Sequence, residues 1–367
     1  MREYKIAAIG GDGIGPEVLE CGLRSLNAVA EYEGFEFSVE RFPWGSDYYR
    51  AYGTMMPDDG LDTLREFDAI YFGAVGDPEI PDDVTLWGLR LVICQGFGLY
   101  ANVRPAVMLP GLRSPLRSEL SNKINWVVVR ENSEGEYAGI GGRTHRGFTE
   151  EIAVDTSVFS RVGIERLQRF AFELALTRPE KHLTCVTKSN AQRFGMVLWD
   201  EIFAELTQKY SDIETDKVLV DAATARMVLN PGSLDVIVAS NLHGDILSDL
   251  AAALAGSLGI AASGNLDPSG NNPSMFEPVH GSAPDIIGNG IANPIAAIWS
   301  GAMMCEHLGE AAGSSRLMAA IAKVAKENKV MTRDLGGDAS TENVTDAIIA
   351  AVRGDDLDLE IFNQLGT

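Results

Sequence analysis

Three aspartates stand where their carboxylates could hold a divalent cation. Asp245 and Asp249 are four residues apart at the start of a long apolar helix pattern, so their side chains would share one helix face. Asp221 directly follows the strand pattern of residues 217–220, and the run 234–239 reads as a buried strand that leads into that helix. Because α/β sheets place ligand-binding groups at the carboxyl ends of their strands, we expect the three carboxylates at one sheet edge. Oxygen ligands alone favour Mg²⁺ or Mn²⁺ over zinc, although an acid such as Asp245 can also serve only to complement the helix dipole.

Four further residues could bind and convert an anionic substrate. Arg104 and Arg130 each end a strand-like segment. Singly each reads as a solvated surface arginine, but together they could clamp carboxylates in the bidentate geometry of a guanidinium group. Tyr137 lies seven residues beyond Arg130, and Lys188 follows the strand pattern that ends at Val186. Such residues usually belong to the core or the surface, but beside a divalent cation a lysine can act as a base near pH 7 and a tyrosine can relay a proton.

These residues need a sheet to bring them together, and strand patterns alternate with helical patterns along the chain. This alternation predicts an α/β fold with a largely parallel sheet. The strand patterns cover residues 4–9, 35–41, 68–72, 125–129, 182–186, 218–220 and 235–239. Two stretches rich in proline, glycine or asparagine, 105–115 and 263–273, are candidate crossings between two lobes. We therefore expect a large lobe formed by residues 1–105 with 264–367 and a small lobe formed by residues 106–263.

The glycine-rich segment 10–17 follows the first strand pattern and opens a helix, as a dinucleotide-binding turn would. Its spacing does not fit that fingerprint, because Val18 stands at the third glycine position and Asp12 would place a negative charge in a phosphate-binding turn. We predict a tight turn with glycines at positive φ, and Pro16 in the first turn of the helix.

Composition narrows the function further. The net charge of −22 argues against nucleic-acid and anionic-membrane partners, so an anionic small-molecule substrate would need a local cluster of cations. The four cysteines show no paired spacing and read as reduced thiols. No apolar stretch is long enough to span a bilayer and no signal-peptide pattern precedes Asp12, so we expect a cytoplasmic protein. The acidic end, residues 354–367, is expected to form a surface tail or a short helix.

Six motifs make the chain similar to the metal-dependent decarboxylating dehydrogenases of 2-hydroxy acids, the family of isopropylmalate and isocitrate dehydrogenases. They are residues 11–17, 102–105, 129–137, 188–190, 241–249 and 277–285. The resemblance covers nearly the whole chain. It implies an α/β, two-lobed fold that is not a Rossmann fold, with a mainly parallel sheet in the large, cofactor-binding lobe.

The resemblance also implies a role for each candidate residue. Asp221, Asp245 and Asp249 become metal ligands, Arg104 and Arg130 bind substrate carboxylates, Lys188 is the base and Tyr137 is the acid. NAD becomes the cofactor, with contacts from Asn190, Glu277, His280, Gly281, Ser282, Ala283, Asp285 and Asn293. The active chain becomes a homodimer, in which Lys188 and Asp221 reach the neighbouring subunit's site. The small lobe would carry the metal site, the substrate-binding residues and the dimer interface, and K⁺ is a further candidate cofactor.

The chemistry implied is oxidation at C2 followed by loss of CO₂. A metal bound to the C1 carboxylate and the C2 oxygen polarises the alcohol, Lys188 takes its proton, and a hydride leaves C2 for the nicotinamide. The resulting β-keto acid then loses CO₂, and Tyr137 protonates C3.

One departure from the family pattern narrows the substrate. Where the family usually carries an arginine ten residues before Arg104, this chain has Cys94, and Arg90 stands one helical turn earlier. With Trp87, Arg90 would make a small, polar pocket, which is most similar to the tartrate and D-malate dehydrogenase branch. Two alternatives are a 3-isopropylmalate dehydrogenase, which the loss of an apolar pocket disfavours, and a non-catalytic regulatory subunit, which the full set of catalytic residues disfavours.

Overall fold

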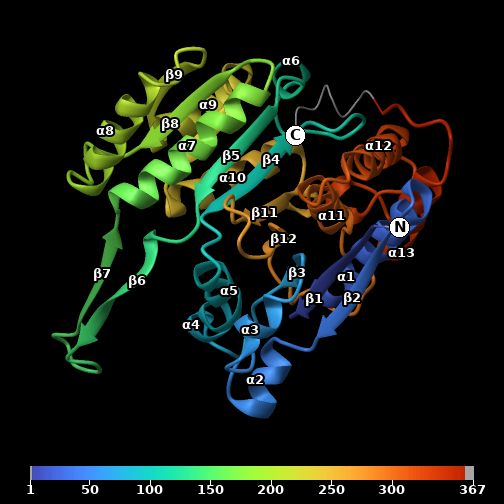
Figure 1. The fold of residues 1–367 in the computed structure, drawn as a ribbon, viewed down its shortest axis with the longest axis horizontal. Helices are drawn as coiled ribbons and strands as arrows, with labels where there is room; N and C mark the ends of the chain where they lie inside the picture. Colours follow the sequence, from blue (N-terminus) through green and yellow to red (C-terminus); the bar gives the residue numbers. More distant parts are fainter. Residues whose placement is uncertain (1, 360–367) are drawn as a thin grey trace.

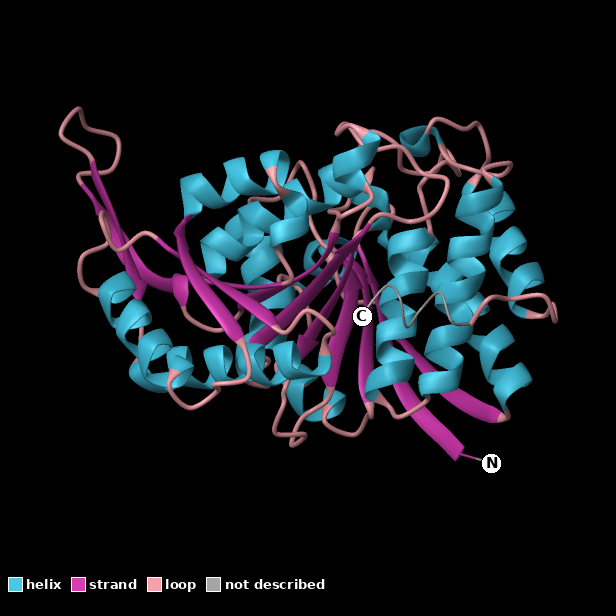
Figure 2. Ribbon diagram, turned by 90° about the horizontal axis from the view of Figure 1, so that it is seen from above, coloured by secondary structure: helices cyan, strands magenta, loops and turns pink. Residues whose placement is uncertain are grey.

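A computed structural model describes residues 2–359 and shows one ten-stranded sheet with helices on both faces (Figures 1 and 2). Its strand order is β2-β1-β3-β12-β11-β4-β5-β10-β8-β9. The strands are β1 (Arg2–Gly11), β2 (Phe35–Phe42), β3 (Ala69–Ala74), β4 (Ala101–Val107), β5 (Asn125–Glu131), β8 (His182–Thr187), β9 (Glu214–Leu219), β10 (Val236–Ala239), β11 (Ala262–Leu266) and β12 (Ser274–Pro278). Neighbours pair in parallel except around β4 and β11, where the pairs β4–β5, β4–β11 and β11–β12 are antiparallel. The predicted α/β fold with a mainly parallel sheet is confirmed.

Helices cover the sheet because its strands are apolar on both sides. In β5, residues 126–131 are all buried, as expected for a strand covered on both faces. The helices are α1 (Gly15–Glu33), α2 (Ser46–Tyr52), α3 (Gly60–Leu64), α4 (Asp82–Thr85), a π-helical turn (Leu86–Arg90), α5 (Leu91–Gly96), α6 (Ser118–Ser121), α7 (Arg161–Thr177), α8 (Gly195–Thr207), α9 (Val220–Leu229), α10 (Asn241–Ala255), α11 (Ile295–His307), α12 (Ala311–Glu327) and α13 (Thr341–Val352). Two core clusters follow: Val128 packs in the one that includes α10, and Val127 and Val129 pack in the one that includes α7 and α8.

The expected lobe boundaries fall inside the sheet. Residue 105 lies in β4 and residue 264 in β11, and these two strands pair, with Gly264 opposite Val103. The stretch 263–273, read as a crossing, thus contains most of strand β11. The sheet therefore runs without interruption from one expected lobe into the other.

A two-stranded hairpin, absent from the sequence reading, extends away from the sheet (Figure 1). It consists of β6 (Gly135–Thr144) and β7 (Ile152–Val158). Its glycines weaken the alternation by which a strand is recognised. Several of its apolar side chains are exposed, among them Ile140, Ile152 and Val154.

The glycine-rich segment forms the predicted tight turn. Gly11 and Gly13 have φ of +66° and +62°, and the turn is followed by α1 with Pro16 in its first turn. Asp12 is buried there, and its carboxylate accepts hydrogen bonds from the backbone N–H groups of Ser46 at 2.6 Å and Gly76 at 2.9 Å. Asp12 thus ties three loops together.

Two further expectations concern the thiols and the chain end. All four cysteines are free, as predicted, and all four are buried. None of the described helices combines the length and apolar character needed to cross a bilayer. Residues 360–367, most of the segment predicted as a tail or short helix, lie outside the described part of the chain.

Candidate active site

Strand alternation aims the two predicted arginines at the same helix. Asn102 and Arg104, two residues apart in β4, share a face of the sheet, and Asn102 pairs with Arg130 of β5. Both arginines therefore lie on the face that α10 covers. Arg104 donates from Nη1 to Ser248 Oγ at 2.7 Å and reaches Asp245 Oδ1 at 3.4 Å. Arg130 also pairs with Asp245 and donates to Asn241 Oδ1 at 2.8 Å. The structure therefore brings Arg104, Arg130 and Asp245 together. Arg130 stands near the end of its strand and Asp245 near the start of its helix, as expected, whereas Arg104 lies in the middle of β4 and not at its end.

Arg90 joins this cluster from a different part of the chain. The π-helical turn Leu86–Arg90 turns its guanidinium inward, where it is 9% exposed. It contacts Glu277 in β12, with Nη2 2.6 Å from Oε1, and donates to Asn265 Oδ1 at 3.2 Å. Burial by itself would lower the pKa of Arg90, but the charge and hydrogen bond of Glu277, together with Cys94 and Asp245, outweigh it and raise the pKa. Arg90 therefore lies in the site and does not point to solvent.

Trp87 takes another direction. Instead of lining the cleft beside Arg90, it packs against Gly139 in β6, while Leu86 lines the cleft. The prediction that Trp87 and Arg90 form one wall of a pocket is therefore wrong. An α-helix would align these two side chains, but the π-helical turn changes their spacing.

The three arginines surround a cleft of about 160 Å³. Its walls come from the two expected lobes: Arg90, Glu277 and His280 on one side, and Arg130, Tyr137 and Asp245 on the other. Such a volume suits a substrate of only a few heavy atoms, since drug-sized ligands occupy pockets of roughly 300–1,000 Å³.

The cleft has more positive than negative charge at its centre. Arg104 and Arg130 share one carboxylate, Asp245, while Glu277 is engaged by Arg90. Burial and the positive charge of Arg130 lower the pKa of Arg104 to about 9, against the attraction of Asp245. Burial likewise lowers the pKa of Arg130. A bound dianion would relieve this repulsion in a chain that is otherwise strongly acidic.

Tyr137 reaches the same carboxylate. Its hydroxyl lies 3.3 Å from Asp245 Oδ2, and the guanidinium of Arg130 lies 5.3 Å from its ring centroid. Burial raises the pKa of Tyr137, and the negative charge of Asp245 raises it further. The phenol therefore stays protonated near pH 7 and can act as a proton donor.

Asp245 lines the cleft, and Asp249 lies one turn further along α10, so the two carboxylates share one helix face at the edge of the cleft. Among the described residues, none donates a hydrogen bond to Asp249, so its oxygens are available. Partial burial raises the pKa of Asp249, and Asp245, one helical turn away, raises it further. Two oxygen donors on one helix face fit a hard divalent cation, because Mg²⁺ typically takes one or two carboxylates and completes its shell with water and substrate.

Lys188 and Asp221 lie apart from this cleft within one chain. They form an ion pair with each other, and this pair lowers the pKa of Asp221. Both lie at carboxyl ends of strands of the same sheet, as predicted, but β8 separates β9 from β10, and neighbouring strands are about 4.8 Å apart. Within residues 2–359, no group of three or more His, Cys, Asp or Glu side chains could hold a metal. Asn190, an exposed residue two beyond Lys188, lies on that side as well.

Most of the expected cofactor residues follow β12 and form a loop beside the glycine-rich turn, whereas Glu277 lies within β12 and Asn190 follows β8. Ser282 O accepts a hydrogen bond from Ile14 N at 2.9 Å, and Ala283 has a φ of +43°. His280 lines the cleft beside Gly281, and its Nε2 is buried without a partner in the described chain, which leaves a polar atom free for a ligand. Asp285 is exposed on the loop, and Asn293 is buried with its Nδ2 2.9 Å from Asp334. These residues fit a polar ligand that runs along the loop from the cleft.

An asparagine network beneath the cleft was not predicted. Asn265 in β11 is fully buried, and its Oδ1 accepts from Asn102 at 2.8 Å, Asn132 at 3.0 Å and Arg90. Its Nδ2 donates to Glu277 at 2.8 Å. The sequence did contain a signal for this network: three asparagines stand in or beside apolar strands, and buried amide groups need hydrogen-bond partners. The network fixes Arg90 and Glu277 relative to β4.

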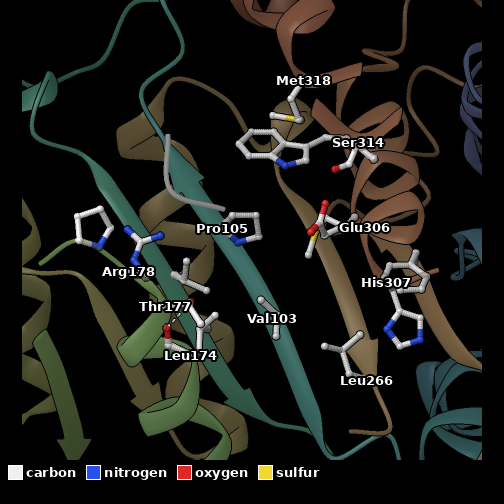
Figure 3. Close-up of a pocket in the computed structure, with 16 residues that line it drawn as sticks. Val103, Pro105, Leu174, Thr177, Arg178, Leu266, Glu306, His307, Ser314 and Met318 are labelled. Atoms are coloured by element: carbon white, nitrogen blue, oxygen red, sulfur yellow. Dashed lines mark hydrogen bonds between the residues drawn. The ribbon is translucent and has the colours of Figure 1, made fainter. Parts of the chain in front are cut away.

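A larger hollow of about 560 Å³ lies on the opposite face of the same strands (Figure 3). Val103 and Pro105 line it, while their neighbours Asn102 and Arg104 face the cleft. Across this hollow lie Glu306 and His307 of α11. The larger space is thus mostly apolar and contains none of the predicted site residues, so size alone does not identify the chemical site.

Comparison with known proteins agrees with these observations. The family described as isocitrate/isopropylmalate dehydrogenase matches residues 5–348. A probable tartrate dehydrogenase/decarboxylase of Agrobacterium vitis is 59% identical over 358 residues, 97% of this chain and 100% of that protein. A D-malate dehydrogenase (decarboxylating) of Escherichia coli is 49% identical over 357 residues, 95% of this chain and 98% of that protein. The crystal structure of isocitrate dehydrogenase from Methylococcus capsulatus has a TM-score of 0.87 at 37% identity and covers 96% of this chain and 100% of that one.

Proposed function

The chain belongs to the isocitrate/isopropylmalate dehydrogenase family, and from this premise we propose that it oxidises and decarboxylates D-malate or tartrate with NAD⁺ and Mg²⁺ or Mn²⁺. The observation that carries the proposal is the shared carboxylate: Arg104 and Arg130, both buried, have one acidic partner between them. Two bidentate guanidinium groups in a small cleft are suited to the two carboxylates of a dicarboxylic acid.

The chain's own residues would divide the reaction between them. When bound, a divalent cation at Asp245 and Asp249 would supply Lewis acidity at the C2 oxygen, and NAD⁺ would accept the hydride. Arg104 and Arg130 would hold the substrate carboxylates, and Lys188 would accept the proton of the C2 hydroxyl. After CO₂ has left, Tyr137 would donate its proton to C3.

The proposal includes a homodimer, because Lys188 and Asp221 do not reach the cleft of their own chain. Exposed apolar side chains support such an assembly: Leu229 at the end of α9 is 73% exposed, Ile246 in α10 is 51% exposed, and Val154 in the hairpin is 55% exposed. Apolar side chains gathered on these neighbouring elements mark a protein interface more often than a free surface. A second copy could bring its own Lys188 and Asp221 to this cleft.

Formation of NADH from D-malate, tartrate and 3-isopropylmalate, measured side by side with each metal, tests the proposal. We expect turnover of D-malate or tartrate with the highest kcat/KM. A higher kcat/KM for 3-isopropylmalate would replace this function by its alternative, and no turnover of any of the three by a folded protein would overturn it.

Replacing Arg90 by leucine is expected to lower kcat/KM for D-malate by about ten- to a hundredfold. The loss corresponds to one charge-assisted hydrogen bond, about 1.5–3 kcal/mol, between the guanidinium and the substrate. For 3-isopropylmalate the same change removes a desolvated charge from the region of the alkyl group. The kcat/KM for 3-isopropylmalate should therefore rise relative to that for D-malate.

The Arg90→Leu variant also leaves Glu277 buried without its ion pair, which is destabilising in itself. Arg90→Leu combined with Glu277→Gln is therefore the matched variant, and thermal unfolding of both should be measured. Unchanged kcat/KM for D-malate in both variants would show that Arg90 has only a structural role.

We expect the enzyme to prefer NAD⁺ to NADP⁺. Asp285 is exposed on the loop after β12, where its carboxylate could accept hydrogen bonds from a ribose 2′-hydroxyl and would repel a 2′-phosphate. The measurement is the ratio of kcat/KM with NAD⁺ to kcat/KM with NADP⁺, at constant substrate and metal concentrations. Asp285→Asn is expected to bring this ratio closer to one. A ratio of one or less in the unaltered enzyme would contradict the assignment.

A further inference from the structure

The segment that carries Tyr137 is not held by its partner strand. In the hairpin, Gly135 pairs with Val158 and Ile140 pairs with Thr156, so residues 136–139 bulge out opposite a single residue of β7. Bulges of this kind re-aim side chains, and they leave the bulged residues without ladder hydrogen bonds. The position of Tyr137 must therefore be fixed by other contacts.

Besides the guanidinium of Arg130, which lies 5.3 Å from the Tyr137 ring centroid, three contacts supply that fixation. The carboxylate of Glu136 accepts hydrogen bonds from Ser240 Oγ and Leu242 N, both at 3.0 Å, at the start of α10. Tyr137 itself meets Asp245, also in α10. The third contact comes from the large lobe, where the Trp87 ring presses against Gly139.

The contact between Trp87 and Gly139 leaves no room for a side chain. A Cβ placed on Gly139 would lie 2.6 Å from Cζ3 and 2.8 Å from Cη2 of Trp87, closer than real Cβ atoms approach other heavy atoms. Gly139 also has a φ of +69°, a conformation that glycine adopts without strain. Trp87 stands in the π-helical turn that ends at Arg90, so the same turn carries one residue into the cleft and another onto the bulge.

We propose that Trp87 is a positioning residue for proton transfer, because its indole holds the 136–139 bulge, and with it Tyr137, at the right distance from the substrate. The inference rests on the proposed role of Tyr137 as the acid of the reaction. Trp87 belongs to the large lobe and Tyr137 to the small lobe, so the contact also ties the placement of the acid to the distance between the lobes. A displacement of about 1 Å at a reacting group can lower its rate about a hundredfold.

Gly139→Ala is the decisive substitution, since it pushes the bulge and the indole apart. We expect kcat for D-malate to fall about ten- to a hundredfold with KM changed less than about threefold, because Arg104 and Arg130 are untouched. The matched control is Gly147→Ala in the same hairpin. Gly147 has a φ of +83°, but a Cβ placed on it would have no other atom within 4 Å, so the substitution carries the same backbone strain without the clash. Its kcat should stay within about twofold of the unaltered enzyme.

Two double variants separate positioning from general damage. In Trp87→Leu the smaller side chain makes room for the new methyl group, so adding Gly139→Ala should lower kcat much less than it does beside Trp87. In Tyr137→Phe the acid is already absent, so adding Gly139→Ala should lower kcat no further. Full additivity in the Tyr137→Phe background, or equal losses in Gly139→Ala and Gly147→Ala, would overturn the proposal.

Thermal unfolding of the four Trp87 and Gly139 combinations gives a readout that needs no turnover. The clash predicts that Gly139→Ala lowers Tm more in the presence of Trp87 than in the Trp87→Leu background, whatever the substrate of the protein is. If the unaltered enzyme were inactive toward 2-hydroxy dicarboxylic acids but this Tm coupling were present, the proposed function would fail while the contact stood. If the enzyme were active but showed no such Tm coupling, the positioning role of Trp87 would fail while the proposed function stood.

Discussion

Asp245→Asn is expected to lower kcat/KM for D-malate by about a thousandfold or more. Asp245 pairs with both arginines that we propose to bind the substrate and accepts a hydrogen bond from Tyr137, and the candidate metal ligand Asp249 lies one helical turn away. Neutralising it weakens the hold on the cation and its Lewis acidity, a contribution of several kcal/mol, about a thousandfold in rate. Steady-state kinetics with Mg²⁺ or Mn²⁺ in excess measure the loss, and raised metal concentrations should recover part of it.

The control for this substitution is Asp212→Asn, which removes the same charge from an exposed position after α8 and should leave kcat/KM unchanged. Excess chelator should abolish turnover of the unaltered enzyme, and added Mn²⁺ should restore it. Full turnover in excess chelator would show that the reaction needs no divalent cation, and it would contradict the assignment of Asp245 and Asp249 as metal ligands.

Coexpression of two inactive variants is expected to restore about a quarter of the unaltered activity, and the purified mixed dimer should have about half of it. Lys188→Ala should reduce turnover by about 10²–10⁴-fold, the usual contribution of a general base. If Lys188 serves the cleft of the partner, a dimer of one Lys188→Ala chain and one Asp245→Asn chain contains one intact site. Random association makes half of the dimers mixed, and half of their sites are intact. Coexpression with two affinity tags and purification by both isolates the mixed dimer for assay.

A mixed dimer of Asp245→Asn with Tyr137→Phe is the control. Both side chains belong to the same chain's cleft, 3.3 Å apart, so each site of this dimer carries one defect and no activity should return. A purified mixed dimer of Lys188→Ala and Asp245→Asn that stays inactive would contradict the sharing of sites between subunits.

Residues whose place depends on local pattern were predicted from the sequence, and those whose place depends on distant partners were not. Arg130 and Asp245 follow from a strand end and a helix start, because the parallel strands β5 and β10 bring their carboxyl ends together. Arg104 lies in the middle of β4, which is antiparallel to β5, and it meets them because Asn102, two residues away, pairs with Arg130. The entry of Arg90 into the site was predicted, but its ion pair with Glu277, 187 residues away, and the π-helical turn that carries it were not, because no periodicity in the sequence indicates them.

The separation of Asp221 from Asp245 did not follow from local pattern either, although the family resemblance implied that Asp221 serves the neighbouring subunit's site. The sequence placed both at the same sheet edge, which the strand directions bear out, but the order of strands within that edge is set by tertiary packing. With β8 between β9 and β10, the two carboxylates are held apart within one chain. Local sequence contains no information on which parallel strand lies between two others.

The alternation of side chains along β4 also limits how this protein can vary over evolutionary time. Asn102 and Arg104 serve the cleft, whereas Val103 and Pro105 form the wall of the hollow on the other side. Deleting or inserting a single codon within β4 would exchange these two sets, so that a guanidinium would enter an apolar space and a valine would replace it in the cleft. The strand can therefore accept changes of residue type at its outward positions but not a change of length. Lineages of this protein should differ in length at the hairpin tip and in the surface loops, while the number of residues in β4 stays fixed.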